Sequence, residues 1–320
     1  MSHSFHRPLG NTGLTVSPIC FGGNVFGWSL DEAASLAMLD ALPDHGINFI
    51  DTADAYSAWV DGNQGGESEA LIGTWFKTRG RRSDVVLATK VGSPMATSPG
   101  GLEADTIVRG VEASLQRLQT DYIDLYQSHR DDADTPIDET LEAFDKLVRA
   151  GKVRALGASN FSADRLKASL DASAANGWAA YTTLQPLYNL MDREAFEQDL
   201  MAVCLENDIA VIPYFSLASG FLTGKYRTDA DIAANPTRGE RVRKYLTPRG
   251  LRVVAALDTV AAETGASPAS VALAWLMARP AIGAPIASAT SLTQLAALSA
   301  AMSLTLTEPQ QALLTTASAP

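Results

Sequence analysis

Short β-prone runs of apolar residues alternate along the chain with longer segments in which apolar residues recur at helical spacing. Eight runs predict strands, at residues 19–23, 48–52, 85–91, 122–128, 153–159, 181–186, 209–214 and 281–287. Helices are expected between and after them, including residues 31–44, 67–77, 103–118, 138–150, 162–175 and 193–207. Strands that alternate with helices pair in parallel through right-handed crossovers. Eight such units in 320 residues predict an α/β chain folded as a (β/α)8 TIM barrel.

An open, doubly wound sheet is the competing architecture. It usually has fewer strands and a glycine-rich phosphate turn after the first one. Gly22-Gly23 does not complete a G-x-G-x-x-G pattern, so the barrel is favoured. Before the first strand, residues 7–16 (RPLGNTGLTV) place Asn-Thr-Gly between two β-prone runs. This pattern predicts a small N-terminal β-hairpin, placed to plug the bottom of the barrel.

Two regions depart from the alternation. Residues 215–249 follow the seventh strand as a long irregular stretch, and a loop of that length inside a compact domain is usually functional or mobile. After Thr307, the segment TEPQQALL predicts an extra C-terminal helix. Gly46, Gly80 and Gly151 follow predicted helices, as C-terminal caps tend to do. We expect residues 1–320 to form one barrel domain.

Composition narrows the class of protein. Hydrophobic residues make up 46% and charged residues 19% of the 33.9 kDa chain, which is ordinary globular usage. The net charge of −11 disfavours binding to nucleic acid or to an anionic membrane. Cys20 and Cys204 lie far apart and are expected to be buried thiols rather than a disulfide. Because no signal peptide or membrane span is recognisable, a cytoplasmic location is expected.

Polar residues stand at the predicted C-terminal ends of consecutive strands, where barrels place their active groups. Asp51 and Tyr56 follow the second strand, Lys90 the third and His129 the fourth. Taken singly, each has a structural explanation, such as a turn cap or a buried aromatic ring. Together they favour a proton donor: a lysine lowers the pKa of a neighbouring phenol, and an aspartate keeps the lysine charged. A histidine N–H can hold an oxygen that gains negative charge.

The order and spacing of several motifs resemble the aldo-keto reductase superfamily over nearly the whole chain. The matching segments are RPLGNTGLTVSPICFGG, GINFIDTADAYS, VVLATKVG, YIDLYQSH, VRALGASNF, LQPLYNL and LASGFLTGKYR. The branch that contains voltage-gated potassium channel β subunits and many bacterial reductases is the most similar. The resemblance implies a nicotinamide-dependent carbonyl reductase with Tyr56 as general acid, Lys90 and Asp51 as its partners, and His129 orienting the substrate carbonyl.

The resemblance also implies where a cofactor is held. Ser159, Asn160 and Gln185 match the residues that bind the carboxamide, and Tyr214 the aromatic ring on which the nicotinamide stacks. The remaining candidates are Ser216, Leu217, Ser219, Gly220 and Lys225 around the pyrophosphate, with Ser288, Thr290 and Gln294 farther along the chain. This chain departs from the family pattern at Phe215-Ser216, where Ser-Pro is frequent, and at Ala297 and Leu298, where an acid and an amide usually contact adenine.

Cofactor preference therefore depends on the remaining polar and basic residues. Thr290, Lys225 and an arginine of the long loop, with Arg238, Arg241 and Arg243 as candidates, are expected to favour NADPH over NADH. Phe26, Trp28 and Trp59 are expected to line the substrate mouth, and loop packing is the alternative explanation for the tryptophans. The expected partner is a small-molecule carbonyl compound. The oligomeric state is left open.

Two other classes of function are weighed against the reductase. A cofactor-binding regulatory or scaffold subunit with little turnover would be favoured by a long N-terminal extension or an apolar docking face, and neither is recognisable in the sequence. A metal-dependent hydrolase needs several histidine and acidic ligands at strand ends. Only His129 of the four histidines stands at such a position, so no metal is expected.

Overall fold

The computed structural model describes residues 5–235 and 239–320, and its centre is an eight-stranded sheet in which every neighbouring pair is parallel. Its strands, listed in chain order, are β3 (Cys20–Gly22), β4 (Phe49–Asp51), β5 (Val86–Val91), β6 (Ile123–Ser128), β7 (Val153–Ser159), β8 (Tyr181–Gln185), β9 (Ala210–Val211) and β10 (Ile286–Ala287). The order in the sheet is β10-β3-β4-β5-β6-β7-β8-β9. All eight coincide with runs that the sequence predicts as strands.

The sheet closes on itself at the segment before β10. Val211 of β9 donates to the carbonyl of Ala281 at 2.8 Å and accepts from the amide of Gly283 at 2.8 Å. The amide of Ile286 then donates to the carbonyl of Pro213 at 2.8 Å, while β10 pairs with β3 on its other side. The last segment therefore bonds to both edges of the sheet, and the predicted (β/α)8 barrel is confirmed.

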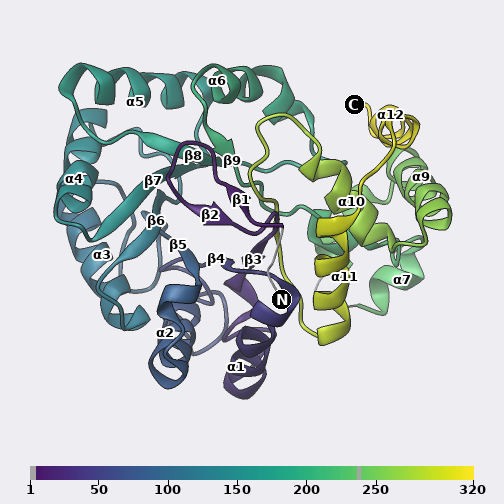
Figure 1. Cartoon of the computed structure of the whole chain (residues 1–320), viewed down its shortest axis with the longest axis horizontal. Coiled ribbons are helices and arrows are strands. Elements are labelled where there is room, and N and C mark those ends of the chain that lie inside the picture. The colour runs from purple at the N-terminus through teal and green to yellow at the C-terminus, as the bar shows by residue number, and fades with distance from the viewer. Residues whose placement is uncertain (1–4, 236–238) are drawn as a thin grey trace.

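Helices surround the strands, as Figure 1 shows. They are α1 (Glu32–Ala41), α2 (Glu67–Arg79), α3 (Ala104–Leu118), α4 (Ile137–Arg149), α5 (Ala163–Asn176), α6 (Met201–Glu206), α7 (Asp229–Ala233), α8 (Gly239–Val242), α9 (Pro248–Thr264), α10 (Pro268–Met277), α11 (Leu292–Ser303) and α12 (Glu308–Ala317). The predicted glycine stops are confirmed, because Gly46, Gly80 and Gly151 have φ of 74°, 62° and 74°. The extra C-terminal helix is α12. Within the described residues, no helix has the length and apolar character needed to cross a membrane.

The N-terminal hairpin seals one end of the barrel. Strands β1 (Arg7–Pro8) and β2 (Thr15–Val16) pair antiparallel and lie across the barrel strands in Figure 1. Leu9, Leu14 and Val16 of this hairpin belong to one buried cluster with residues from the barrel strands, including Phe49 and Leu125. The hairpin thus fills the bottom with apolar side chains, as the sequence predicts, and leaves the other end for chemistry.

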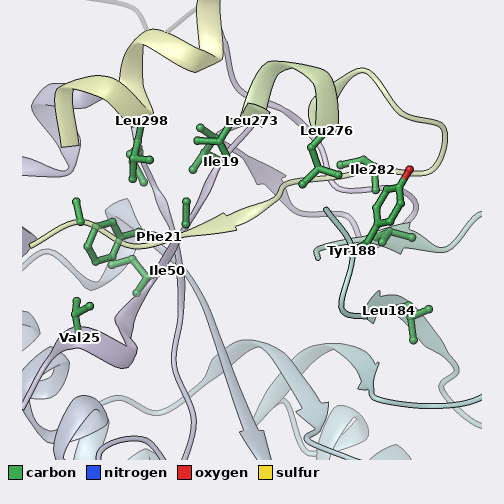
Figure 2. Packing of buried hydrophobic residues seen from close by; sticks show 14 of the residues in the cluster. Ile19, Phe21, Val25, Ile50, Leu184, Tyr188, Leu273, Leu276, Ile282 and Leu298 are labelled. Carbon is green, nitrogen blue, oxygen red and sulfur yellow. The ribbon is translucent and has the colours of Figure 1, made fainter. Parts of the chain in front are cut away.

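A second apolar layer joins the outside of the barrel to the helices. Figure 2 shows Leu273 of α10 and Leu298 of α11 near Ile19 and Phe21 of the first strand region, with Leu276 of α10 farther along the same layer. All five side chains are almost completely buried. Cys20 and Cys204 are likewise buried and free, which agrees with their expected role as small apolar residues.

The stretch predicted to be irregular, residues 215–249, is more ordered than expected. It contains a 3-10 segment at Ala218–Thr223, the short helices α7 and α8, a 3-10 turn at Arg243–Tyr245 and the start of α9. The hydroxyl of Tyr245 donates to Asp192 Oδ2 at 2.6 Å and ties this stretch to the segment after β8. Helices of four or five residues are too short to produce a hydrophobic period, so the sequence pattern does not reveal them.

Candidate active site

Three side chains that the sequence places at strand ends form one hydrogen-bonded cluster. Lys90, at the end of β5, donates from Nζ to Asp51 Oδ2 at 2.7 Å and to the hydroxyl oxygen of Tyr56 at 2.9 Å. The Tyr56 hydroxyl also donates to Asp51 Oδ2 at 3.0 Å. Lys90 and Asp51 are fully buried, so their charges are paired in a site without solvent screening. The expected association of Asp51, Tyr56 and Lys90 is confirmed.

Neighbouring strands hold this cluster in place. The third hydrogen bond of Lys90 Nζ goes to the carbonyl of Thr52 at 2.8 Å, which satisfies all three of its protons. Asp51 Oδ1 accepts from Gln185 Nε2 at 2.9 Å and from Gln127 Nε2 at 3.3 Å. Donors from β5, β6 and β8 therefore converge on the Asp51 carboxylate. This network fixes the direction in which Lys90 approaches the phenol.

The direction of the pKa shift at Tyr56 differs from the expectation drawn from the sequence. Burial raises the pKa of the Tyr56 phenol well above its usual value, and the adjacent Asp51 carboxylate raises it further. The expected lowering by Lys90 is thus outweighed by burial and by Asp51, which the pairing of residue types does not reveal. The phenol is protonated at neutral pH, as a proton donor must be. The Lys90 ammonium, 2.9 Å away, would stabilise the phenolate left after donation.

His129 stands beside this phenol as a neutral imidazole. Its ring centroid lies 6.0 Å from that of Tyr56, in an edge-to-face arrangement. Burial lowers the pKa of His129 well below its usual value, and the charges of Lys90 and Arg130 lower it further. Nδ1 is buried without a hydrogen-bond partner among the described residues. This leaves Nε2 as the ring nitrogen able to reach an oxygen in front of Tyr56.

A cavity of about 900 Å³ opens in front of the cluster. The predicted site residues that line it are Trp28, Tyr56, Trp59, His129, Ser159, Asn160, Gln185, Tyr214, Ser216, Leu217, Ser219, Gly220, Lys225, Ser288 and Gln294. Asp51 and Lys90 lie buried behind Tyr56 and are not part of the wall. One cavity therefore joins residues from separate strand ends with the segment after β9.

Aromatic side chains form one wall of the mouth. The rings of Trp28 and Trp59 meet edge to face with centroids 5.6 Å apart, and Trp59 lies 6.0 Å from Tyr56 in the same manner. Both tryptophans line the cavity, as expected. Phe26 does not: it is completely buried and stacks on Phe21 at 5.6 Å, so its assignment to the substrate mouth is wrong. Its backbone points the ring into the core, which the sequence cannot reveal for a loop residue.

Amide and hydroxyl groups form another part of the cavity wall. Asn160 has a left-handed φ of 58° and donates from Nδ2 to the carbonyl of His129 at 2.9 Å. Its Oδ1 accepts from the Tyr214 hydroxyl at 2.8 Å. Ser159 donates to the carbonyl of Gln185 at 2.9 Å. The three residues expected to bind the carboxamide thus lie next to the Tyr214 ring expected to stack on the nicotinamide, and that ring is fixed at its hydroxyl end.

The segment after Tyr214 has an unusual backbone. Ala218, Ser219 and Gly220 have φ of 48°, 58° and 100°, so three consecutive residues are left-handed although only one is glycine. Non-glycine residues pay a conformational penalty in this region, and such strain concentrates at binding sites. Lys225 stands two residues after the end of the 3-10 segment at Thr223 and lines the cavity. Ser219, Gly220 and Lys225 of this segment therefore form part of the cavity wall.

The three arginines proposed for the long loop have different surroundings. Arg243 pairs with Asp229 at 2.6 Å and Glu240 at 2.9 Å and does not line the cavity. Arg241 lines it, with its guanidinium 5.7 Å from the centroid of the Trp28 ring. Arg238 lies outside the described residues. Arg243 is therefore excluded as the arginine that would contact a 2′-phosphate, because its N–H donors already bind carboxylates.

The end of the cavity near α11 is largely apolar. Ala297 and Leu298 are part of its wall, together with Ser288 and Gln294. Thr290 is not among the residues that line the cavity, but it is partly exposed and its amide donates at 2.8 Å to Oε1 of Gln294, which does line it. Direct contact of Thr290 with a cofactor stays a prediction. Ser288 donates through its hydroxyl toward Gly22 and Asn24, each at 2.8 Å.

Several residues in and around the site are missing from the sequence-based set. Gln127 supports Asp51, and Asn24 and Arg130 line the cavity. Asp54 is buried with Oδ1 unpartnered among the described residues, and burial together with Glu69 raises its pKa to about 7. Gln127 stands two residues before His129, and side chains two residues apart in a strand point to the same side. This spacing could have identified Gln127 as a residue of the site. Arg130 follows a strand end directly, whereas nothing in the pattern singles out Asn24 or Asp54.

Comparisons with known proteins agree with this geometry. Residues 18–319, which include the cluster and the cavity, match the family model described as the aldo/keto reductase family. YrpG of Bacillus subtilis, an uncharacterized oxidoreductase, is 36% identical over 294 residues, or 90% of this chain and 87% of that protein. A probable voltage-gated potassium channel β subunit of Arabidopsis thaliana is 34% identical over 299 residues, covering 91% and 88%. The NADP(+) aldo-keto reductase yakc of Schizosaccharomyces pombe is 34% identical over 282 residues, covering 85% and 79%.

Proposed function

Because the chain belongs to the aldo/keto reductase family, we propose that it reduces an aldehyde or ketone to the alcohol with NAD(P)H as hydride donor. The observation that carries this proposal is the buried Asp51–Lys90 pair in contact with Tyr56, whose ring faces the cavity. A phenol held beside a buried ion pair in this way can give its proton to a carbonyl oxygen. The reaction class follows from the site rather than from the barrel, which hosts many chemistries.

The residues present fit a nicotinamide dinucleotide. Asn160, Ser159 and Gln185 offer amide and hydroxyl groups to a carboxamide, and Tyr214 offers a flat ring beside them. Ser219 and Lys225 on the cavity wall suit a pyrophosphate, because a hydroxyl donor and a cation both favour an anion. When bound, NAD(P)H supplies a hydride to the carbonyl carbon.

The protein's own groups account for the proton. Tyr56 gives the hydroxyl proton to the carbonyl oxygen, and the electron pair of the O–H bond stays on the phenolate. Lys90 stabilises that phenolate through its 2.9 Å contact, and Asp51 keeps Lys90 charged in its buried position. His129 donates from Nε2 to the same carbonyl oxygen and orients the carbonyl toward Tyr56. The proton removed from Tyr56 returns from solvent after the alcohol leaves.

We expect measurable turnover of a reactive aldehyde. The full chain is mixed with NADPH and 4-nitrobenzaldehyde, and loss of the reduced nicotinamide absorbance is followed. Steady consumption of cofactor in proportion to enzyme supports a reductase. The similarity to potassium channel β subunits favours a second function, that of a cofactor-binding subunit with little turnover. Tight cofactor binding without turnover of any aldehyde in a panel would favour that second function.

NADPH is expected to bind more tightly than NADH. Lys225 and Arg241 are cations on the cavity wall, and one charge-assisted hydrogen bond to a 2′-phosphate contributes roughly 1.5–3 kcal/mol, or about 10–100-fold in affinity. The side chains of Ala297 and Leu298 cannot hydrogen-bond adenine. Their presence weakens the binding of both cofactors alike and leaves the ratio of the two affinities unchanged. Fluorescence titration of the protein with each cofactor gives this ratio.

Single variants assign the preference to a residue. Lys225→Gln and Arg241→Gln each remove one cation, while Arg243→Gln removes one that faces carboxylates away from the cavity. Arg241→Gln should narrow the ratio of NADPH affinity to NADH affinity, and Arg243→Gln should not. Lys225→Gln should weaken both cofactors alike where it contacts the shared pyrophosphate, and should narrow the ratio only where it contacts the 2′-phosphate. Equal affinities for the two cofactors in the unmodified protein would contradict the preference itself.

A further inference from the structure

Arg130 is a cation of the cavity wall that the described residues leave without an ionic partner. It is exposed, it directly follows His129, and it lines the cavity. The two acidic residues next to it in sequence are engaged elsewhere. Asp131 binds Arg165 Nε at 2.8 Å, and Asp132 Oδ2 accepts from the amide of Leu102 at 2.8 Å. These two carboxylates therefore do not neutralise the Arg130 guanidinium.

The charge of the whole cavity points the same way. Among the described residues that line it are Arg130, Lys225 and Arg241, and no aspartate or glutamate is among them. This is unusual for a chain with a net charge of −11. Lys225 and Arg241 belong to the segment after β9, which the proposed cofactor phosphates would occupy. Arg130 comes from the loop after β6, so the cofactor segment does not account for it.

Arg130 also lies close to the reacting groups. Its charge is near enough to the His129 ring to help lower the pKa of that imidazole. On the Tyr56 side, Trp28 and Trp59 supply flat apolar surface, and Trp59 is 48% exposed. A molecule whose carbonyl meets Tyr56 and His129 would thus have an aromatic wall and a guanidinium within reach.

We propose that the substrate is an aldehyde or ketone that carries a carboxylate on a planar body, and that Arg130 binds this carboxylate. The inference rests on the reductase activity proposed above and adds the chemical class of its substrate. A planar guanidinium matches a carboxylate through two parallel hydrogen bonds, which makes arginine selective for such a group. Arg130 acts in binding and takes no part in the transfer of hydride or proton.

A matched pair of aldehydes tests this assignment. 4-Formylbenzoate carries the negative charge, and methyl 4-formylbenzoate has nearly the same shape without it. With NADPH saturating, we expect kcat/KM for the acid to exceed that for the ester by about 10-fold or more, since hydrogen bonds to charged groups contribute roughly 1.5–3 kcal/mol. The preference should shrink as salt is added, because the guanidinium is exposed to solvent.

Two variants locate the preference. Arg130→Gln should lower the acid-to-ester ratio of kcat/KM by about 10–100-fold, mainly through KM, because the contact is made equally in the bound substrate and in the transition state. Arg252→Gln on α9 is the matched control: it removes one exposed positive charge outside the cavity and should keep the ratio.

The possible failures are separable. If neither aldehyde is reduced, the proposed reductase function fails first. If both are reduced with similar kcat/KM, the reductase stands and the anionic substrate class is wrong. If the acid is preferred but Arg130→Gln keeps the preference, the assignment to Arg130 is overturned.

Discussion

The Tyr56→Phe variant is expected to lose about 10²–10⁴-fold in kcat, the range that general acid catalysis contributes. Phenylalanine keeps the ring beside Trp59 and His129 but has no proton to give. The hydroxyl makes one hydrogen bond to Asp51 and accepts one from Lys90. Because Lys90 keeps its bonds to Asp51 and to the Thr52 carbonyl, the cost to folding should be only about 1 kcal/mol.

Steady-state kinetics with a saturating cofactor measures this loss, and fluorescence titration checks that cofactor binding is kept. Tyr122→Phe is a matched control, since it removes the same atom from a tyrosine outside the cavity whose ring packs under Arg82. The control should retain the unmodified kcat. A Tyr56→Phe enzyme with normal kcat would reject Tyr56 as the proton donor.

The Lys90→Met variant should fail in two ways. Its kcat should fall by about 10²–10⁴-fold, because the phenolate formed at Tyr56 loses its neighbouring cation. Its free energy of unfolding should fall by about 3–5 kcal/mol, the usual cost of leaving one partner of a buried ion pair unpaired. Asp51 would then be a carboxylate without solvent or counter-ion, held by the two glutamine amides.

A double variant separates the two effects. In Lys90→Met with Asp51→Asn, both buried charges are gone, so the free energy of unfolding should recover part of the loss while kcat stays low. Denaturant unfolding measures the first quantity, and aldehyde reduction the second. Recovery of kcat together with stability would mean that Lys90 serves folding alone. An unchanged pH profile and rate in Lys90→Met would contradict the proposed coupling to Tyr56.

The sequence predicts the barrel and the central cluster because both depend on periodic patterns. Alternating strands and helices bring strand ends to one rim, so Asp51, Lys90 and His129 meet although they lie far apart in the chain. The raised pKa of Tyr56 is not predictable in this way. It depends on how completely neighbouring side chains exclude water, which is a property of packing in three dimensions.

Loop residues mark the other limit of prediction. Phe26 and Trp28 are both aromatic residues after the first strand, yet one enters the core and the other lines the cavity. No period governs such positions, because loop dihedrals decide each direction separately. Thr290 also lies in a loop, where its amide hydrogen-bonds to Gln294, and its contact with a cofactor stays a prediction. Short helices in residues 215–249 escape notice because they bury too few residues to show a repeat.

The division between strand-borne and loop-borne residues has a consequence for how this protein can change. Asp51, Lys90 and Gln185 are rooted in β4, β5 and β8 and completely or almost completely buried, so substitutions there disturb folding and chemistry together. Trp59 and Arg130 stand in loops, and both are exposed. Mutations that alter the mouth can therefore accumulate without disturbing the buried residues that support the proton donor. Laboratory evolution toward new carbonyl compounds should recover its beneficial mutations in these loops, with Asp51, Lys90 and Gln185 inherited unchanged.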